Sequence, residues 1–142
     1  MILYLDTSAL VKAYITENAS REVLAAMKQA KIVASHSFAY VEAHSTFSRI
    51  KREKKLNEQQ YDSVTASFKK DWGNYLQIEN TKILIEHAAD LVEALALRAY
   101  DSVHLAAADM LSKKLKQNII FACFDRQLNK AAHILGLSLL EL

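Results

Sequence analysis

MILYLDTSALVK, residues 1–12, is the stretch that decides the fold of this chain. Residues 2–5 form an unbroken apolar run, which is typical of a strand buried on both faces of a parallel sheet. The run stops at Asp6, and a helical pattern begins beyond Thr7 and Ser8. Because open α/β sheets bind ligands at the carboxyl ends of their strands, Asp6 is predicted to lie at a ligand site.

The rest of the chain continues to alternate between strand and helix. Further strands are expected over residues 32–35, 75–78, 119–124 and 137–140. Helical patterns, with Asn57 and Thr81 as N-caps, run over residues 8–14, 21–29, 38–52, 57–72, 81–91, 101–111 and 127–135. This alternation predicts an α/β fold, with a central, mostly parallel sheet of four to five strands flanked by helices on both faces.

The spacing of apolar residues in two of these helices predicts which side chains face the core. They are Val23, Leu24 and Met27 in the earlier helix and Phe38, Val41 and Phe47 in the later one. Most aromatic side chains of the two central helices, 38–52 and 57–72, are expected to be buried as well.

The composition is that of an ordinary globular domain. With 142 residues, 51% of them hydrophobic and 24% charged, a single domain can bury its own core. The single cysteine, Cys123, excludes an internal disulfide and suits a reducing cytoplasm, where we expect the protein to reside. No signal peptide is expected, and no segment approaches the roughly 20 apolar residues of a membrane span. The net charge of +2 permits a nucleic-acid partner without requiring one.

Four acidic residues stand out because of their places relative to the predicted elements. Asp6 and Asp125 each end a buried strand and precede a helix, and Asp101 opens a strongly apolar helix. Helix capping is the alternative role for these three, since Asp is a preferred N-cap and its charge suits a helix amino terminus. Glu42 lies in the apolar half of its helix, where an acid is costly unless a salt bridge or a metal neutralises it.

Asp6 and Asp125 are expected to approach each other, because strand ends at the switch point of a doubly wound sheet are neighbours in space. Two carboxylates ~4 Å apart repel by about 4 kcal/mol at an effective dielectric of about 20. Such a cluster requires bound protons or a cation, and oxygen ligands favour Mg²⁺ or Mn²⁺ over zinc. Asp109, two helical turns beyond Asp101, is expected to be a surface acid or to support the site from behind.

Four sequence blocks, each containing one of these acids, together resemble one known family. They are LDTSALVK, YVEA, LRAYDSVHLAAA and CFDRQLNKAAHILGL, in matching order and spacing. Over essentially the whole chain they are similar to the PIN-domain ribonucleases, and most of all to the VapC toxins of prokaryotic toxin–antitoxin pairs. The resemblance implies a PIN-like three-layer fold, in which residues 1–142 form a single PIN domain.

The same resemblance implies an activity, a cofactor and partners. The chain would be an endoribonuclease that cleaves RNA phosphodiester bonds and leaves a 5′-phosphate and a 3′-hydroxyl. It would use Mg²⁺ or Mn²⁺, be held inactive by a small VapB-like antitoxin and form a homodimer. The central helices, 38–52 and 57–72, would contribute to a groove for the antitoxin. The implied catalytic and metal-binding residues are Asp6, Glu42, Asp101 and Asp125, with Thr7 or Ser8 supporting them through a hydroxyl.

Five basic residues are candidate contacts to RNA phosphates, which Lys and Arg bind irrespective of sequence. Lys12, Arg98 and Arg126 stand close to the acids in the sequence. Arg49 and Arg52 belong to a basic cluster at the end of a predicted helix. For that cluster the alternative is a solvated helix end, which the helix dipole favours.

Three other functions remain compatible with the sequence. A housekeeping PIN nuclease would share every catalytic residue, and a non-catalytic RNA- or protein-binding module could use the same fold. A phosphotransfer enzyme with Asp6 as its nucleophile would want a second Asp two positions on, where this chain has Ser8. No histidine has zinc-ligand spacing of the HExxH kind, and His104 is expected to pack or hydrogen-bond locally.

Overall fold

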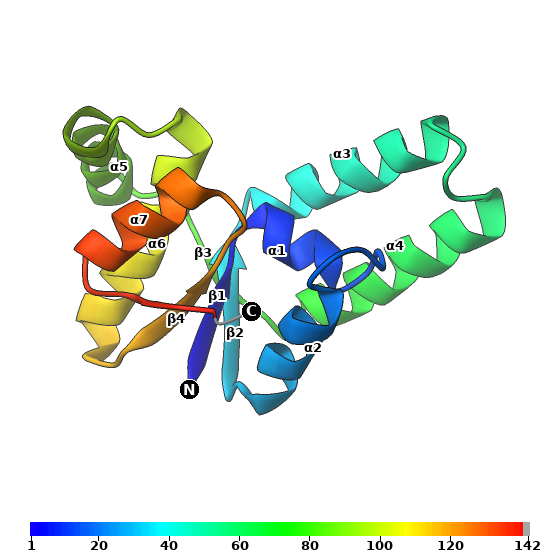
Figure 1. Ribbon diagram of the computed structural model, residues 1–142, viewed down its shortest axis with the longest axis horizontal. Helices are drawn as coiled ribbons and strands as arrows, with labels where there is room; N and C mark the ends of the chain where they lie inside the picture. Colours follow the sequence, from blue (N-terminus) through cyan, green and yellow to red (C-terminus); the bar gives the residue numbers. More distant parts are fainter. Residues whose placement is uncertain (141–142) are drawn as a thin grey trace.

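The computed structural model describes residues 1–140 as one parallel sheet between two layers of helices (Figure 1). The strands are β1 (Ile2–Leu5), β2 (Ile32–His36), β3 (Leu76–Ile78), β4 (Ile119–Ala122) and β5 (Ser138–Leu139). The helices are α1 (Thr7–Lys12), α2 (Ser20–Gln29), α3 (Ala39–Arg52), α4 (Glu58–Trp72), α5 (Lys82–Leu95), α6 (Ala99–Leu115) and α7 (Arg126–Ile134). The expected strands and helices are all present, with boundaries shifted by a few residues.

The sheet has the strand order β3-β2-β1-β4-β5, and every neighbouring pair is parallel. β1 therefore lies at the centre, with Ile2 paired to Ile32 on one side and to Ile119 on the other. The chain builds outward from β1 in one direction and then returns to its other side. This reversal places a switch point at the carboxyl end of β1, next to the end of β4, where the amide of Asp6 donates to the Ala122 carbonyl at 3.1 Å.

The first strand is buried on both faces, as its apolar run predicted. Ile2 and Tyr4 face the layer that contains α5, α6 and α7, and Leu3 and Leu5 face the layer that contains α1 to α4 (Figure 1). All four side chains are at most 2% exposed. Because successive side chains of a strand point to opposite faces, these four residues contribute to both hydrophobic cores.

The helices α3 and α4 form a hairpin that extends away from the sheet on the side opposite α5 (Figure 1). Phe47 of α3 and Phe68 of α4 hold the two helices together through an edge-to-face ring contact with 5.6 Å between centroids. The predicted N-cap is confirmed, because Asn57 and Gln60 form a complete capping box at the start of α4.

The predicted buried faces of α2 and α3 are partly wrong. Leu24, Phe38 and Val41 are 50%, 45% and 68% exposed. In α3 the buried row is formed by residues four apart, Ala39, Ala43 and Phe47. Phe38 precedes the helix as its N-cap, and Val41 points away from the row of buried residues. The buried row of α3 thus combines two small residues with Phe47, while the larger apolar residues Phe38 and Val41 are exposed.

The start of α6 also differs from the prediction. The helix begins at Ala99 with Arg98 in the N-cap position, so Asp101 lies in the first turn and does not open the helix. Within residues 1–140, no helix combines the length and apolarity that a membrane span needs.

Candidate active site

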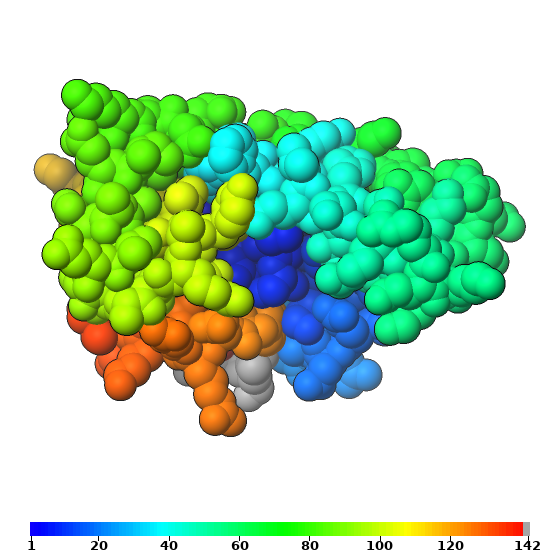
Figure 2. Space-filling view, turned by 90° about the horizontal axis from the view of Figure 1, so that it is seen from above, coloured from blue at the N-terminus to red at the C-terminus, as the bar shows by residue number. Residues whose placement is uncertain are grey.

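A pocket of about 220 Å³ lies at the carboxyl ends of β1 and β4, and all four predicted acids line it. Figure 2 looks onto this edge and shows the first residues of the chain in dark blue at the bottom of a hollow. The start of α3 in cyan, the start of α6 in yellow and the start of α7 in orange border it. The acids come from four separate segments: Asp6 after β1, Glu42 in α3, Asp101 in α6 and Asp125 after β4.

Asp6 caps α1 and lines the pocket at the same time. Its Oδ1 accepts the Ala9 amide at 2.9 Å and the Ser8 hydroxyl at 2.7 Å, while its Oδ2 accepts no hydrogen bond within residues 1–140. Burial raises the pKa of this carboxyl, against the lowering effects of His104 and the two hydrogen bonds. Helix capping and a place in the pocket are thus compatible for Asp6, since capping uses Oδ1 and leaves Oδ2 without a hydrogen bond within residues 1–140.

Glu42 is held by two neighbouring side chains. Its Oε1 accepts the Thr7 hydroxyl at 2.7 Å and lies 3.3 Å from Nε2 of His104. Burial acts to raise the pKa of Glu42, but the bonds to His104 and Thr7 outweigh it and hold the pKa below its usual value. Glu42 therefore enters the pocket as a carboxylate.

Asp101 and Asp125 share one arginine. The Nε of Arg98 donates to Asp101 Oδ2 at 3.0 Å, and its Nη2 lies 3.5 Å from Asp125 Oδ2. The other oxygen of Asp125 caps α7 by accepting the Leu128 amide at 2.8 Å. Within residues 1–140, no three His, Cys, Asp or Glu side chains are arranged to hold one metal ion. The fold thus gathers the acids in one pocket but leaves them bound to internal partners.

His104, Tyr100 and Phe124 also line the pocket, and sequence reasoning did not place them there. His104 is buried, and its Nδ1 lies 2.8 Å from the Tyr4 hydroxyl. The sequence carried a signal, because residues three apart on a helix share a face and His104 follows Asp101 by three. The expectation that His104 packs is confirmed, since its buried ring contacts Tyr4 edge-on. Its hydrogen bonds are not local, because their partners lie on β1, α1 and α3.

His36 fixes the start of α3 and thereby the segment that carries Glu42. Its Nδ1 accepts the Phe38 amide at 3.0 Å, so its Nε2 carries the hydrogen and donates to Asn80 Oδ1 at 2.6 Å. Burial lowers the pKa of His36, because the charged imidazolium is poorly solvated there.

We expect this histidine to make stability depend on pH. A histidine whose pKa is lower in the folded state stabilises the fold above its unfolded-state pKa of about 6.5, and this contribution is lost as the pH falls. Urea unfolding between pH 7.5 and 5 should show a falling free energy of unfolding, with a smaller fall in the His36→Gln variant. Equal slopes for both proteins would contradict this assignment.

The predicted basic residues fall into two groups. Arg98 lines the pocket, and Arg126 follows Asp125 on the exposed start of α7. Lys12 lies over the ring of the pocket residue Phe124 and pairs with Glu17 at 3.2 Å. The remaining two, Arg49 and Arg52, lie in the last turn of α3 and do not line the pocket.

Asp109 is neither a surface acid nor a support of the pocket, so that expectation was wrong. It is only 3% exposed, and its Oδ2 accepts from Lys113 at 2.9 Å and lies 2.8 Å from His87 Nε2. Its partners therefore lie on α5 and farther along α6. Asp109 follows Asp101 by eight residues on α6, which places it away from the edge of the sheet where the pocket lies.

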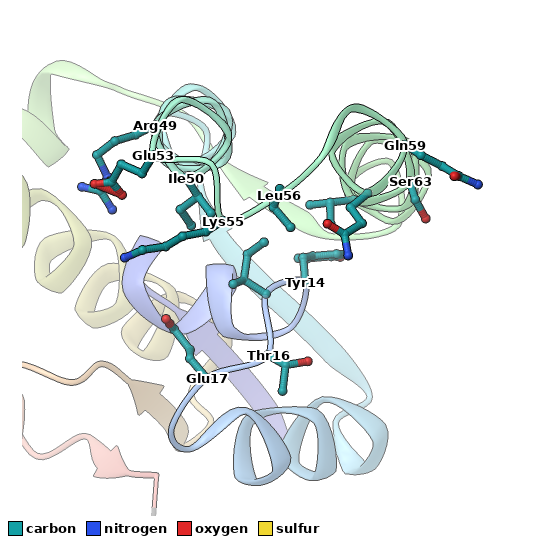
Figure 3. A pocket seen from close by; sticks show the side chains of 13 residues that line it. Tyr14, Thr16, Glu17, Arg49, Ile50, Glu53, Lys55, Leu56, Gln59 and Ser63 are labelled. Atoms are coloured by element: carbon teal, nitrogen blue, oxygen red, sulfur yellow. The ribbon is translucent and has the colours of Figure 1, made fainter.

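A second, larger groove of about 780 Å³ lies between the segment after α1 and the α3–α4 hairpin. Figure 3 shows Lys55 and Glu17 on opposite sides of it, with Leu56 from the α3–α4 turn between the two helices. Ile50 and Tyr14 add further apolar surface. The groove is therefore lined by a mixture of apolar, polar and charged side chains.

Comparison with known proteins identifies the family. The PIN domain model matches residues 3–134, so this chain belongs to the PIN-domain family. Ribonuclease VapC45 and Ribonuclease VapC49, from two strains of Mycobacterium tuberculosis, are each 30% identical to it over 135 residues. These matches cover 95% of this chain and 92% of each relative. Within the PIN family, the chain is thus a member of the VapC-type ribonucleases.

Solved structures show the same fold. FitAcB from Neisseria gonorrhoeae superposes with a TM-score of 0.64 at 14% identity, covering 99% of this chain and 97% of that one. VapC20 of Mycobacterium tuberculosis, a toxin that cleaves the sarcin-ricin loop, also gives 0.64 at 12% identity, covering 91% and 94%. The predicted PIN-like three-layer fold is confirmed.

Proposed function

We propose that this protein is a divalent-metal-dependent endoribonuclease that acts in the cytoplasm as the toxin of a VapBC-type pair. The observation that carries the proposal is the convergence of four acids from distant segments on one pocket at the sheet edge. Membership of the VapC-type ribonucleases supports an RNA substrate. In this proposal Asp6, Glu42, Asp101 and Asp125 are the catalytic acids.

The donor set suits Mg²⁺ or Mn²⁺. The four acids offer carboxylate oxygens, which are the ligands these hard cations prefer. The Oδ2 of Asp6 is the oxygen left free by the capping interaction, and ion binding would require Asp101 and Asp125 to exchange Arg98 for the cation. When bound, a divalent cation lowers the pKa of water and neutralises charge that develops on a phosphate.

The surrounding residues orient the acids and receive the RNA. Thr7 and Ser8 each donate a hydroxyl to one acid, which fixes the carboxylates before substrate arrives. Arg98 lines the pocket, Lys12 lies over the ring of the lining residue Phe124, and Arg126 follows Asp125 in the sequence. These three residues would bind the phosphates on either side of the cleaved bond. By analogy with the family, cleavage would leave a 5′-phosphate and a 3′-hydroxyl.

Arg98 is expected to compete with the metal ion, since it holds the two acids that the ion would bind. Replacing it in Arg98→Gln should raise the affinity for Mn²⁺ several-fold, because a positive charge leaves the pocket. The same variant should bind a non-cleavable RNA more weakly. Calorimetric titration of the metal-free protein measures the first effect, with Arg49→Gln as a control of equal charge outside the pocket. Weaker Mn²⁺ binding in Arg98→Gln would contradict the competition.

The nuclease proposal is tested by incubating the purified protein with end-labelled RNA and Mg²⁺. We expect internal cleavage with 5′-phosphate products, and none from a variant in which all four acids are replaced by their amides. RNA that stays intact, while the protein still binds it, would favour the non-catalytic module instead.

The toxin role requires a cognate VapB-like antitoxin, and the large groove is the site that we propose for it. Expression of this chain alone should stop growth, and co-expression of the small protein encoded immediately upstream should restore it. Rescue should fail for Leu56→Glu, which puts a charge into the lining of the groove, and persist for Ile83→Glu on the exposed face of α5. A chain that leaves growth unaffected would favour a housekeeping PIN nuclease.

We further propose a homodimer, which a sedimentation measurement tests.

A further inference from the structure

We propose that His104 is a positioning residue, set in one tautomer by the buried Tyr4 and presenting its Nε2–H to Glu42. A hydrogen-bond chain would then run from the hydrophobic core to one acid of the pocket. This role rests on the proposed function, because it assigns a supporting residue to the same metal site.

The buried end of this series of hydrogen bonds, at Tyr4, is rigid. Tyr4 is fully buried in the central strand, and its ring stacks on Phe121 with centroids 5.6 Å apart and an interplanar angle of 10°. The His104 ring contacts the Tyr4 ring edge-on, with 5.8 Å between the two centroids, and the Tyr4 hydroxyl lies 2.8 Å from Nδ1 of His104. Because Tyr4 and His104 are both buried, neither ring can turn without disturbing the core.

One contact of His104 assigns its tautomer, and a second is compatible with that assignment. A neutral imidazole has one N–H donor and one acceptor nitrogen. The tyrosine hydroxyl can donate to Nδ1, which leaves the hydrogen on Nε2. That nitrogen lies 3.3 Å from both Glu42 Oε1 and Thr7 Oγ1. A carboxylate only accepts hydrogen bonds, so the opposite tautomer would set two lone pairs against each other.

Glu42 depends on this support more than Asp6 and Asp125 do. Those two carboxylates accept backbone amides at the starts of α1 and α7. Glu42 lies within α3, and its hydrogen bonds in residues 1–140 come from the side chains of Thr7 and His104. Both bonds end on Oε1, which leaves Oε2 free to face a ligand. Residues that orient a metal ligand in this way typically change metal affinity about 10- to 100-fold when replaced.

The tautomer can be measured without metal or RNA. In metal-free protein labelled with ¹⁵N at histidine, we expect His104 to show a protonated Nε2 and an unprotonated Nδ1. Tyr4→Phe removes only the hydroxyl and should shift this pattern, whereas Tyr75→Phe, whose hydroxyl bonds to Tyr14 far from the pocket, should not. A hydrogen on Nδ1 of the wild-type protein, alone or with one on Nε2, would overturn the proposal.

Calorimetric titration with Mn²⁺ then tests the positioning role. We expect His104→Leu to weaken binding about 10- to 100-fold. His104→Gln should recover much of the loss, because its amide nitrogen can replace the Nε2–H donor. Equal affinity in wild type and His104→Leu would overturn the proposal while leaving the metal site intact. A wild-type protein that takes up no Mn²⁺ would instead overturn the proposed function itself, so the two failures are distinguishable.

Discussion

The Asp6→Asn variant is expected to cleave RNA roughly a thousand-fold more slowly than the wild-type protein. A metal ion stabilises the transition state of phosphate cleavage by several kcal/mol, and about 1.4 kcal/mol corresponds to a tenfold rate. Asp6 lies at the centre of the site, at the end of the central strand. Loss of its charge should therefore remove most of this stabilisation. The rate of cleavage of a labelled RNA under single-turnover conditions measures the effect.

The same substitution should leave the metal-free fold as stable as before, or more stable. Asn is as good an N-cap as Asp, so its side-chain oxygen can still accept from Ala9 and Ser8. Because burial raises the pKa of Asp6, its ionised form opposes folding once the pH exceeds that pKa. The amide removes this penalty at neutral pH, and its advantage should shrink as the pH falls and the wild-type carboxyl takes up a proton.

Asp109→Asn is the matched control, because it makes the same change at a buried acid away from the pocket. It should lower the free energy of unfolding by weakening the contacts to His87 and Lys113, and it should leave RNA cleavage unchanged. A marked loss of thermal stability in Asp6→Asn, with cleavage retained, would show that Asp6 serves only as a helix cap.

Removing divalent cations is expected to abolish cleavage reversibly. Four carboxylates around one pocket would repel a negatively charged phosphate, and the proposed chemistry needs a cation that offsets this charge and lowers the pKa of water. Treatment with EDTA should stop cleavage, and Mg²⁺ or Mn²⁺ in excess should restore it fully. Circular dichroism of the chelated protein controls for loss of the fold. Full activity in the presence of chelator would exclude the mechanism.

The fold was predictable because its central segment carries an unambiguous pattern. Four apolar residues followed by Asp6 indicate a doubly buried strand, and the similar pattern before Asp125 indicates its neighbour. The faces of the helices were harder to predict. Val41 has helical spacing from Phe38 but not from Phe47, which lies six positions further on. The residues buried in the same row as Phe47 are Ala39 and Ala43, so two small side chains mark this face while the larger Phe38 and Val41 are exposed.

The pocket was predictable to the extent that strand ends define it. Asp6 and Asp125 follow strands that the sequence predicts. Both cap a helix and also line the pocket, so the capping role did not exclude the role in the pocket. The partners of the acids were not predictable, since they depend on contacts across the sheet edge. The spacing of His104 from Asp101 indicated which face of α6 it shares, but not its partner Glu42, which lies 62 positions away in the sequence.

The central claim is that four acids from distant segments share one cation, and calorimetric titration of the metal-free protein with Mn²⁺ tests it most directly. The variants to compare with the wild-type protein are Asp6→Asn, Glu42→Gln, Asp101→Asn and Asp125→Asn, with Asp109→Asn as the control. We predict one class of site in the wild-type protein, at least about tenfold weaker binding in each of the four variants, and no change in the control. Mn²⁺ binding that survives the loss of these carboxylates undiminished would contradict the account.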